Sequence, residues 1–488
     1  MHQSEGYVQV MPPPRSWSVS PRIRTLLIVS TAGFLAFLDS SIVNIAFPAI
    51  RADFSSTSLE SISWVLNAYN LVFAAALVPA GRLADRTGRR PLFIAGLVLF
   101  VASSAACAFA PDAGTLIGAR VFQALGAAAL VPAAQALYLP LFSREERPRA
   151  IALFGAVAAA SAAAGPTLGG ILVDQASWRW VFLVNVPVGL LAVAATIRWV
   201  QEPAYDRVSR IPDVLGMVVL AAALGGLAYG LVEGGSLGWT SSPVLLAFAA
   251  FVVLIPLFVW RSRRTPLPAV PLELFRFRSF RVATLATTTF GAGFYALTLC
   301  NVLFLTTVWG YSPLQAGFAI APSAVAAVVV APLAGGLVRA RGPRVPLALG
   351  ALAYGGAVLL LLLFAPTRPQ LALWLPVVVL AGIGIGLIFS SLAAAQVSDL
   401  DASQFSVGSA IGNASRQIGA VLGVAILVAV LGTPSGIDAF HRGWILTLAG
   451  ASISGLLAVA LPRQPRPPQR LQGASAALVR DELEASRV

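Results

Sequence analysis

Long runs of apolar residues, separated by short polar hinges, make up most of the sequence. The runs are about 20 residues long, which is the length that a helix needs to cross roughly 30 Å of hydrocarbon. They are continuously apolar rather than alternating, so they predict helices and not the strands of a membrane barrel. We expect about fourteen membrane-spanning helices, which begin near Ile23, Ser61, Leu92, Gly114, Ala150, Trp178, Asp213, Pro243, Ser279, Pro313, Arg344, Gln370, Ser403 and Arg442.

The composition agrees with a membrane protein. Of the 488 residues, 58% are hydrophobic and 11% are charged, and the mean hydropathy is +0.83. Globular domains of this length carry more charge and fewer apolar residues. The fold class that follows is an all-α polytopic membrane protein.

The basic residues are distributed unevenly between the two sides of the predicted helices. All 33 are arginines, and the formal net charge is +13. If the N-terminus is cytoplasmic, 27 of them lie in cytoplasmic segments, against only four in outer segments, namely Arg51, Arg179, Arg368 and Arg442. An excess of arginine marks the cytoplasmic side, so both termini are expected there. The net charge then reflects topology and attraction to anionic lipid, and no nucleic-acid partner is expected.

Residues that would indicate other kinds of site are scarce. The first 20 residues lack the order of basic, apolar and small residues that marks a removable signal peptide. Cys107 and Cys300 both lie in apolar runs, and His2 and His441 are too far apart in the chain to suggest a metal site. The chain has no lysine, so a Walker loop for ATP is excluded, and the glycines of 382–386 follow no strand. We expect no enzyme activity and no cofactor, and an ion gradient as the energy source.

A short loop sequence occurs twice. GRLADRTGRR (81–90) follows the second predicted helix, and a weaker copy, GGLVRARGPR (335–344), follows the tenth. The copy has Arg339 in place of Asp85. This spacing aligns helices one to six with helices nine to fourteen, the layout of transporters whose two halves rock about a central site. We therefore expect tails at 1–22 and 463–488, six-helix bundles at 23–200 and 266–462, and a linker with two extra helices at 201–265.

Several stretches resemble one family of transporters. GRLADRTGRRPLF (81–93) is similar to the loop signature of the major facilitator superfamily. Six further stretches resemble, in order, the motifs of its fourteen-span drug:proton antiporter branch. They are LDSSIVNIAFPAI (38–50), WVLNAYNL (64–71), the run 116–129, GAVAAASAAAGPTLGG (155–170), WRWVFLVNVPVG (178–189) and YSPLQAGFAIAPSA (311–324). The resemblance implies the major facilitator fold, with two six-helix bundles plus two inserted helices, and export by alternating access.

The loop after the second predicted helix is a candidate cytoplasmic gate. Its glycines allow a tight turn between two helices, and an acid among four arginines can form charge-assisted hydrogen bonds. The resemblance implies that the acid holds the cytoplasmic side closed, here against the region of Ser403 to Ser406. The alternative is that the arginines only fix the topology. The gate residues are Gly81, Asp85, Arg86, Gly88, Arg89 and Arg90.

Asp39 is the most unusual single residue, because it lies about sixteen positions into the first apolar run. An ionised carboxylate there costs roughly 2.5 kcal/mol or more unless it is paired or hydrated. Such a group is a candidate for proton coupling. Alternatively, it forms a permanent ion pair with Arg120, or it contacts a cationic substrate directly. The resemblance implicates Arg120 in proton transfer, although Ala124 follows Gln123 where the family usually has glycine.

The fifth predicted helix carries a proline between glycines. The resemblance implies an antiporter hinge at Gly155, Gly165, Pro166, Gly169 and Gly170. Close packing between helices is the alternative explanation of the glycines. A proline within a helix also leaves a carbonyl group free and permits a bend.

Polar and aromatic residues within the helices are candidates for a substrate cavity. Most aromatic residues of a membrane protein pack or lie at the interface, so each is only a candidate. Arg416 could contact substrate, water or backbone carbonyls. The set is Asn44, Trp64, Tyr69, Gln123, Phe294, Tyr295, Asn301 and Arg416.

The expected function is a proton-coupled antiporter. It would export amphipathic or cationic drugs and toxic organic compounds across a bacterial cytoplasmic membrane, as a monomer. One alternative is a dedicated exporter of a single secondary metabolite, for antibiotic self-resistance or siderophore release. Import is less favoured only because the motifs resemble those of exporters. A sensor without transport activity is less favoured because the sequence has no long soluble segment that could serve as an output domain.

Overall fold

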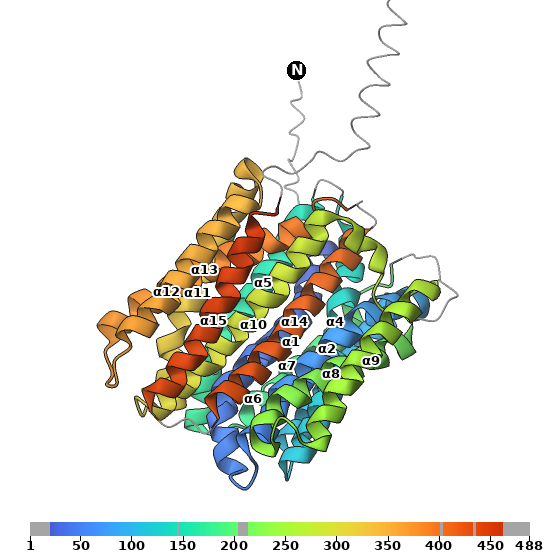
Figure 1. Cartoon of the computed structure of the whole chain (residues 1–488). Helices are drawn as coiled ribbons and strands as arrows, with labels where there is room; N and C mark the ends of the chain where they lie inside the picture. Colours follow the sequence, from blue (N-terminus) through green and yellow to red (C-terminus); the bar gives the residue numbers. More distant parts are fainter. Residues whose placement is uncertain (1–19, 144–145, 204–212, 401–403, 433–435, 462–488) are drawn as a thin grey trace, which may run out of the picture.

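The computed structural model describes residues 20–143, 146–203, 213–400, 404–432 and 436–461. Throughout these residues the regular structure is helical (Figure 1). The long helices are α1 (Pro21–Asp53), α2 (Leu59–Thr87), α3 (Arg89–Ala108), α4 (Ala113–Tyr138), α5 (Arg147–Gln175), α7 (Asn185–Trp199), α8 (Val214–Leu237), α9 (Ser242–Arg264), α10 (Arg278–Thr307), α11 (Pro313–Arg341), α12 (Arg344–Phe364), α13 (Leu371–Val397), α14 (Phe405–Leu431) and α15 (Ile437–Ala458).

Three shorter elements complete this list. They are η1 (Leu139–Leu141), α6 (Trp180–Leu183) and η2 (Leu272–Arg276). Only Val184 separates α6 from α7, so the two together form one apolar segment. Every predicted run therefore coincides with a helix or a helix pair, and the starts agree within five residues.

Twelve helical segments of the described residues are long and apolar enough to cross a membrane. The helices α5 and α15 are not among these twelve, although they have 29 and 22 residues. The structure thus confirms an all-α polytopic membrane protein. The number fourteen stays a prediction.

Local sequence signals explain where several helices begin and end. The Asp112 side chain accepts a hydrogen bond from the Thr115 amide at the start of α4, and Ser312 and Gln315 form a reciprocal capping box at the start of α11. Gly88 and Gly342 close α2 and α11 with φ values of 104° and 76°, a region that favours glycine. The two copies of the loop sequence therefore make the same kind of turn.

The helices pack as two groups that meet along two pairs of helices. Within the first group, α1 packs on α5, α4 and α7, while α4 packs on α2 and α3. Within the second, α10 packs on α13, α14 and α15, and α12 and α13 pack on their neighbours. The groups meet where α5 lies against α11 and α2 against α14. The pair α8 and α9 lies outside, with α8 in contact with both α2 and α14 (Figure 1).

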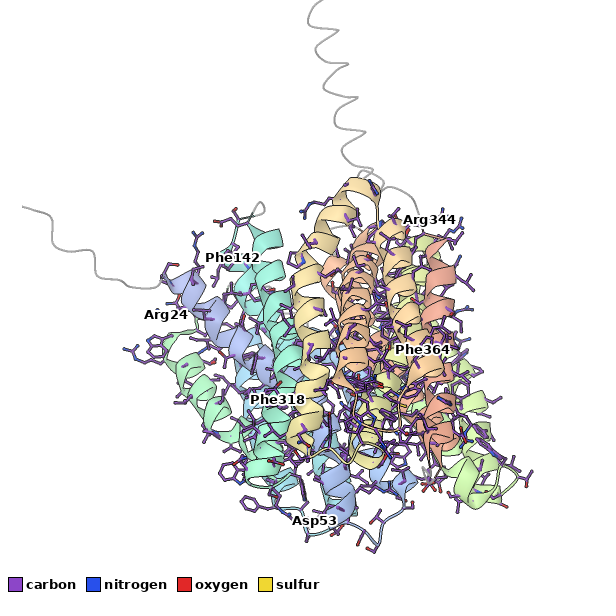
Figure 2. All side chains as sticks on the ribbon, turned by 90° about the vertical axis from the view of Figure 1, so that its left-hand side faces the viewer. Arg24, Asp53, Phe142, Phe318, Arg344 and Phe364 are labelled. Carbon is purple, nitrogen blue, oxygen red and sulfur yellow. The ribbon has the colours of Figure 1, made fainter. Side chains whose placement is uncertain are left out.

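The two ends of the bundle differ in charge. Figure 2 shows Arg24 and Arg344 near the same end of the bundle and Asp53 near the other. We refer to the end that contains Arg24, the 81–90 loop and Arg344 as the arginine-rich end. Because α1 begins at this end and α2 returns to it, the 81–90 loop lies there as well.

Candidate functional site

The acid and the base that lie deepest in the first group of helices are in direct contact. Arg120 of α4 donates a hydrogen bond through one terminal nitrogen to Asp39 Oδ2 of α1, and the two form a salt bridge. The side chains are only 1% and 0% exposed. Burial of two charges is tolerated only when they are paired and their remaining hydrogen-bonding groups are satisfied.

Two further side chains, Gln123 and Asn185, hydrogen-bond to Asp39, and Ser104 bonds to both of them. Gln123 Nε2 donates to Asp39 Oδ1 at 2.9 Å and also to Ser104 Oγ at 2.8 Å. Asn185 Nδ2 lies 3.4 Å from both Asp39 Oδ1 and Ser104 Oγ. Arg120 donates in turn to Gln123 Oε1 at 2.6 Å. We call Asp39, Ser104, Arg120, Gln123 and Asn185 the Asp39 cluster.

Aromatic rings and a backbone carbonyl hold the guanidinium group of Arg120. Its Nε donates to the Val65 carbonyl oxygen of α2 at 3.0 Å. The Tyr69 ring lies 4.0 Å from the guanidinium carbon, close enough for a cation–π contact. The Tyr69 hydroxyl itself donates to the Ala36 carbonyl oxygen of α1 at 3.2 Å. The Asp39 cluster therefore connects α1, α2, α3, α4 and α7.

This arrangement has a clear chemical consequence. Asp39 can take up a proton only if its ion pair with Arg120 weakens, and Arg120 keeps its charge when that happens. The side-chain amides of Gln123 and Asn185 can hydrogen-bond to Asp39 in both its ionised and its protonated form, because an amide both donates and accepts hydrogen bonds. Asn185 Oδ1 is buried without a hydrogen-bond partner, so the cluster has spare acceptor capacity.

The structure places two predicted cavity residues, Gln123 and Tyr69, in the Asp39 cluster or directly against it. Ser104 and Asn185 were not predicted. Both are polar residues within apolar helices, and that was the only signal in the sequence that could have identified them.

The predicted gate loop is anchored by an acid that sequence reasoning missed. Glu202 lies just beyond α7, and its two carboxylate oxygens accept hydrogen bonds from the backbone amides of Arg89 and Arg90 at 2.8 and 2.7 Å. These amides are at the start of α3, where a helix has free N–H groups and a partial positive charge. A Cβ on Gly81 would lie 3.3 Å from the Pro132 Cβ of α4, so this glycine allows a close approach. The side chains of Asp85, Phe405 and Ser406, and the whole of Ser403, lie outside the described part of the chain, so the contact predicted between them stays a prediction.

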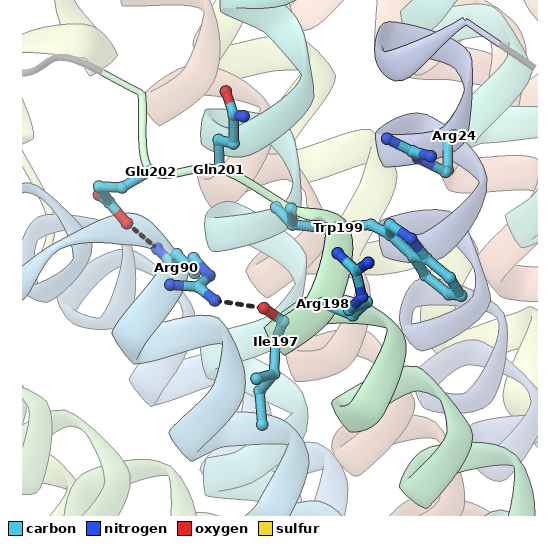
Figure 3. A pocket seen from close by; sticks show the side chains of 8 residues that line it. Arg24, Arg90, Ile197, Arg198, Trp199, Gln201 and Glu202 are labelled. Carbon is cyan, nitrogen blue, oxygen red and sulfur yellow. Dashed lines mark hydrogen bonds between the residues drawn. The ribbon is translucent and has the colours of Figure 1, made fainter.

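A pocket of about 430 Å³ lies beside this anchor (Figure 3). Arg90 Nη2 donates to the Ile197 carbonyl oxygen at 2.7 Å on one side of it. Its lining is Arg24, Arg90, Ile197, Arg198, Trp199, Val200, Gln201 and Glu202. The pocket thus joins α1, α3 and the end of α7 at the arginine-rich end.

The glycines of the predicted hinge lie at contacts between helices. A Cβ on Gly165 or Gly169 of α5 would collide with Ser41 or Ile42 of α1. A Cβ on Gly170 would lie 2.7 Å from the Pro313 carbonyl oxygen of α11, in the other group of helices. The Pro166 carbonyl of α5 belongs to the same contact with α11, since a Cβ on Gly317 of α11 would collide with its oxygen. Gly155 and its surroundings lie outside the described side chains.

The remaining cavity candidates are distributed over both groups of helices. Arg416 of α14 has its guanidinium carbon 5.8 Å from the Phe37 ring of α1 and 5.6 Å from the Phe389 ring of α13. It donates to Asn413 Oδ1 at 3.2 Å, and its Nε is buried without a partner. Nearby in the sequence, Gln417 Oε1 accepts a hydrogen bond from the Tyr295 hydroxyl at 3.1 Å.

Four other candidates are engaged in packing or hydrogen bonding within their own group. Phe294 packs edge-on against Tyr295 and Phe389. Asn301 is buried and accepts a hydrogen bond from the Trp444 indole at 3.1 Å. Asn44 donates to the Ser40 carbonyl of its own helix, and the partly buried Trp64 packs on the apolar core.

Comparison with known families decides what kind of protein this is. The family model of the Major Facilitator Superfamily matches residues 29–214 and 208–424. The chain belongs to this superfamily. It is therefore a multi-pass membrane transporter of a small-molecule substrate.

Relatives with known names place this transporter in the multidrug-type branch of the superfamily. It is 36% identical to the multidrug resistance protein Stp of Mycobacterium tuberculosis over 84% of this chain and 76% of the relative. It is 33% identical to the methylenomycin A resistance protein of Streptomyces coelicolor over 84% and 86%. It is 32% identical to the tetracenomycin C resistance and export protein of Streptomyces glaucescens over 86% and 78%. The sequence resemblance to this family is confirmed.

Proposed function

We propose that this transporter is a proton-coupled antiporter that exports amphipathic organic compounds from a bacterial cell. Protons would enter by way of Asp39, with Arg120 as the charge that competes for its carboxylate. The 81–90 loop would close the arginine-rich end, which we take as the cytoplasmic side, and the glycine contacts of α5 would close the opposite end. The names of the relatives, which are resistance and export proteins, favour export over import.

The observation that carries the proposal is the buried pair of Asp39 and Arg120. A buried ion pair is poor evidence for stability, because apolar residues of similar volume stabilise as well or better. Inside a membrane such a pair is retained for function by default, and proton relay is a known use of an intramembrane acid. The amides of Gln123 and Asn185 give Asp39 hydrogen-bonding partners in both protonation states.

The test uses everted membrane vesicles with an imposed proton gradient and a panel of fluorescent amphipathic dyes. We expect wild-type vesicles to accumulate dye, an uncoupler to abolish the accumulation, and Asp39→Asn to reduce it at least tenfold. Asp53→Asn is the matched control, since it makes the same chemical change at the other end of α1. Asp53 pairs with Arg179 and is 43% exposed, so its charge is not desolvated.

Each result has a separate meaning. Accumulation that survives the uncoupler would contradict proton coupling. Unimpaired Asp39→Asn at normal membrane abundance would move the proton site elsewhere. Equal loss in Asp53→Asn and Asp39→Asn would indicate a general effect of charge on α1 rather than a proton site.

A dedicated exporter of one metabolite is the second candidate. It is favoured by the relatives named for single antibiotics, methylenomycin A and tetracenomycin C. The same vesicles distinguish the two, because a dedicated exporter would transport one compound class and ignore the rest of the panel.

A further inference from the structure

We propose that the pocket formed by Arg24, Arg90, Arg198 and Trp199 binds the phosphate headgroup of an anionic phospholipid. The ligand would lie in the leaflet at the arginine-rich end, with its phosphate in the pocket and its acyl chains along α1 and α7. The binding site is distinct from the Asp39 cluster and does not depend on the proposed export function.

The charge of the pocket favours an anion. Three guanidinium groups surround it, and one carboxylate, Glu202, is present among its lining residues (Figure 3). Both carboxylate oxygens of Glu202 accept hydrogen bonds from backbone amides at the start of α3, so this acid already has hydrogen-bond partners other than the three guanidinium groups. The buried Nε groups of Arg24 and Arg90 have no hydrogen-bond partner. The pocket thus has a net positive charge and hydrogen-bond donors that have no acceptor within the protein.

The size and shape of the space suit a phosphodiester. A volume of about 430 Å³ accommodates a headgroup with its glycerol unit and lies within the usual range of small-molecule sites. Arginine binds phosphate well because its planar group presents several donors in a fixed geometry. The Arg24 guanidinium carbon lies 5.8 Å from the Trp199 ring, which keeps the two side chains together at one edge of the pocket.

Exposed apolar residues on the same helices favour a lipid over free phosphate. Leu27 lies one helical turn below Arg24 and is 53% exposed, and Leu191 lies two turns from Arg198 and is 71% exposed. Ile197, at the pocket itself, is 55% exposed. Trp199, which is amphipathic and half exposed, occupies the position of an interfacial anchor. A charged pocket that continues into an exposed apolar surface matches a headgroup that continues into acyl chains.

A bound lipid would act on the transporter through the helices that it connects. The pocket joins α1, α3 and the end of α7, and the same three helices supply Asp39, Ser104 and Asn185 to the Asp39 cluster. An anionic headgroup would neutralise the repulsion between the three arginines and hold these helix ends together. We therefore expect anionic lipid to stabilise the fold of the first group of helices.

The experiment compares binding of phosphatidylglycerol, phosphatidylcholine and inorganic phosphate to the purified full-length protein in detergent. Lipid binding is counted by native mass spectrometry and confirmed by the shift in melting temperature. The variant is Arg24→Gln/Arg198→Gln, which leaves the gate residue Arg90 intact. The matched control, Arg263→Gln/Arg341→Gln, removes the same two charges from exposed arginines at the arginine-rich end but outside the pocket.

We expect phosphatidylglycerol to bind better than phosphatidylcholine, and the pocket variant to bind it about thirtyfold less tightly, since each arginine near anionic lipid contributes roughly a factor of five. The control should bind nearly as the wild type does. Equal weakening in both variants would show that only general surface charge matters, and unchanged binding in the pocket variant would also overturn the proposal. Inorganic phosphate that competes with the lipid at low concentration would identify a free-phosphate site instead. None of these readouts requires transport, so a failure of the proposed export function leaves them interpretable.

Discussion

Replacing Asp39 by asparagine should separate the structural role of the Asp39 cluster from its role in proton transfer. The change keeps the size of the side chain but removes the negative charge next to Arg120, which is only 1% exposed. Arg120 cannot give up its proton, so it stays charged without a carboxylate partner. Removing one partner of a buried ion pair costs about 3–5 kcal/mol. The hydrogen bonds of Arg120 to Gln123 and Val65 remain, as does its cation–π contact with the Tyr69 ring, and they place the expected loss at the lower end, about 3 kcal/mol.

The double variant Asp39→Asn/Arg120→Gln should recover most of that stability. It removes the stranded charge and leaves two neutral amides, which can hydrogen-bond to each other and to Gln123. Unfolding in detergent, followed by melting temperature at fixed lipid and detergent concentration, measures the three proteins side by side. Proton-driven dye export in vesicles is then measured at matched membrane abundance.

The two measurements together discriminate the hypotheses. If Asp39 carries the proton, the double variant is nearly as stable as the wild type but does not couple export to the gradient. If the ion pair is only structural, the double variant exports dye with the normal dependence on the gradient, and our reasoning on coupling is refuted. A single variant as stable as the wild type would instead refute the desolvation argument.

Three further predictions follow from the described contacts. Gly170→Ala should destabilise the contact between α5 and α11 by about 1–3 kcal/mol through overpacking. The distance between spin labels on these two helices, at the end opposite the arginine-rich end, should therefore lengthen, whereas Gly118→Ala, with open space around its Cβ, should leave it unchanged. An unchanged distance in Gly170→Ala would contradict the close contact. Hydrogen bonds from the Thr115 amide and hydroxyl lower the pKa of Asp112 below 3.8. The ionised Asp112 therefore stabilises the fold fully above pH 3.8, and this stabilisation is lost as the pH falls through the lowered pKa. Asp112→Ala should lower the melting temperature near neutral pH by a margin that shrinks in acid, and a margin that does not change with pH would contradict this. If the buried Nε of Arg416, which has no hydrogen-bond partner, serves an anionic substrate, Arg416→Gln should weaken export of an acidic amphipathic dye about tenfold and leave export of its neutral ester unaffected, because a charge-assisted hydrogen bond to the substrate would be lost. Equal effects on both dyes would argue for a structural role.

The helices could be predicted because the membrane imposes a strong rule on the sequence. A span needs about 20 apolar residues whatever its neighbours are, so the runs themselves locate the helices. The break at Val184 between α6 and α7 was not predicted, although the polar Asn185 and the proline Pro187 follow it directly and proline cannot donate a backbone hydrogen bond. Asp39 and Arg120 could be predicted for the opposite reason: a charge within such a run is costly and therefore conspicuous.

The partners of Asp39 could not be predicted from the same signals. Ser103 and Ser104 are adjacent in α3, and both hydrogen-bond to their own helix, yet only Ser104 reaches the Asp39 cluster. Which serine does so depends on the rotation of α3 against α4, and the sequence does not state that rotation. Glu202 is even less visible, because it lies 113 residues from Arg89 and looks like an ordinary polar residue after a helix.

The position of α1 suggests why proton binding and the movement of the two groups of helices would be linked. Ser41 and Ile42 follow Asp39 within one turn of α1 and lie against Gly165 and Gly169 of α5. The next residue of α5, Gly170, lies against the backbone of α11 in the other group. Helices in such close contact cannot slide past each other without a shift of the whole helix, because the Ser41 and Ile42 side chains fit against the glycines on one side and the backbone of α11 lies against Gly170 on the other. A movement of α1 that opens the ion pair of Asp39 must therefore either displace α5 or strain the contact of α5 with α11, and both outcomes would change how the two groups of helices meet at the end opposite the arginine-rich end.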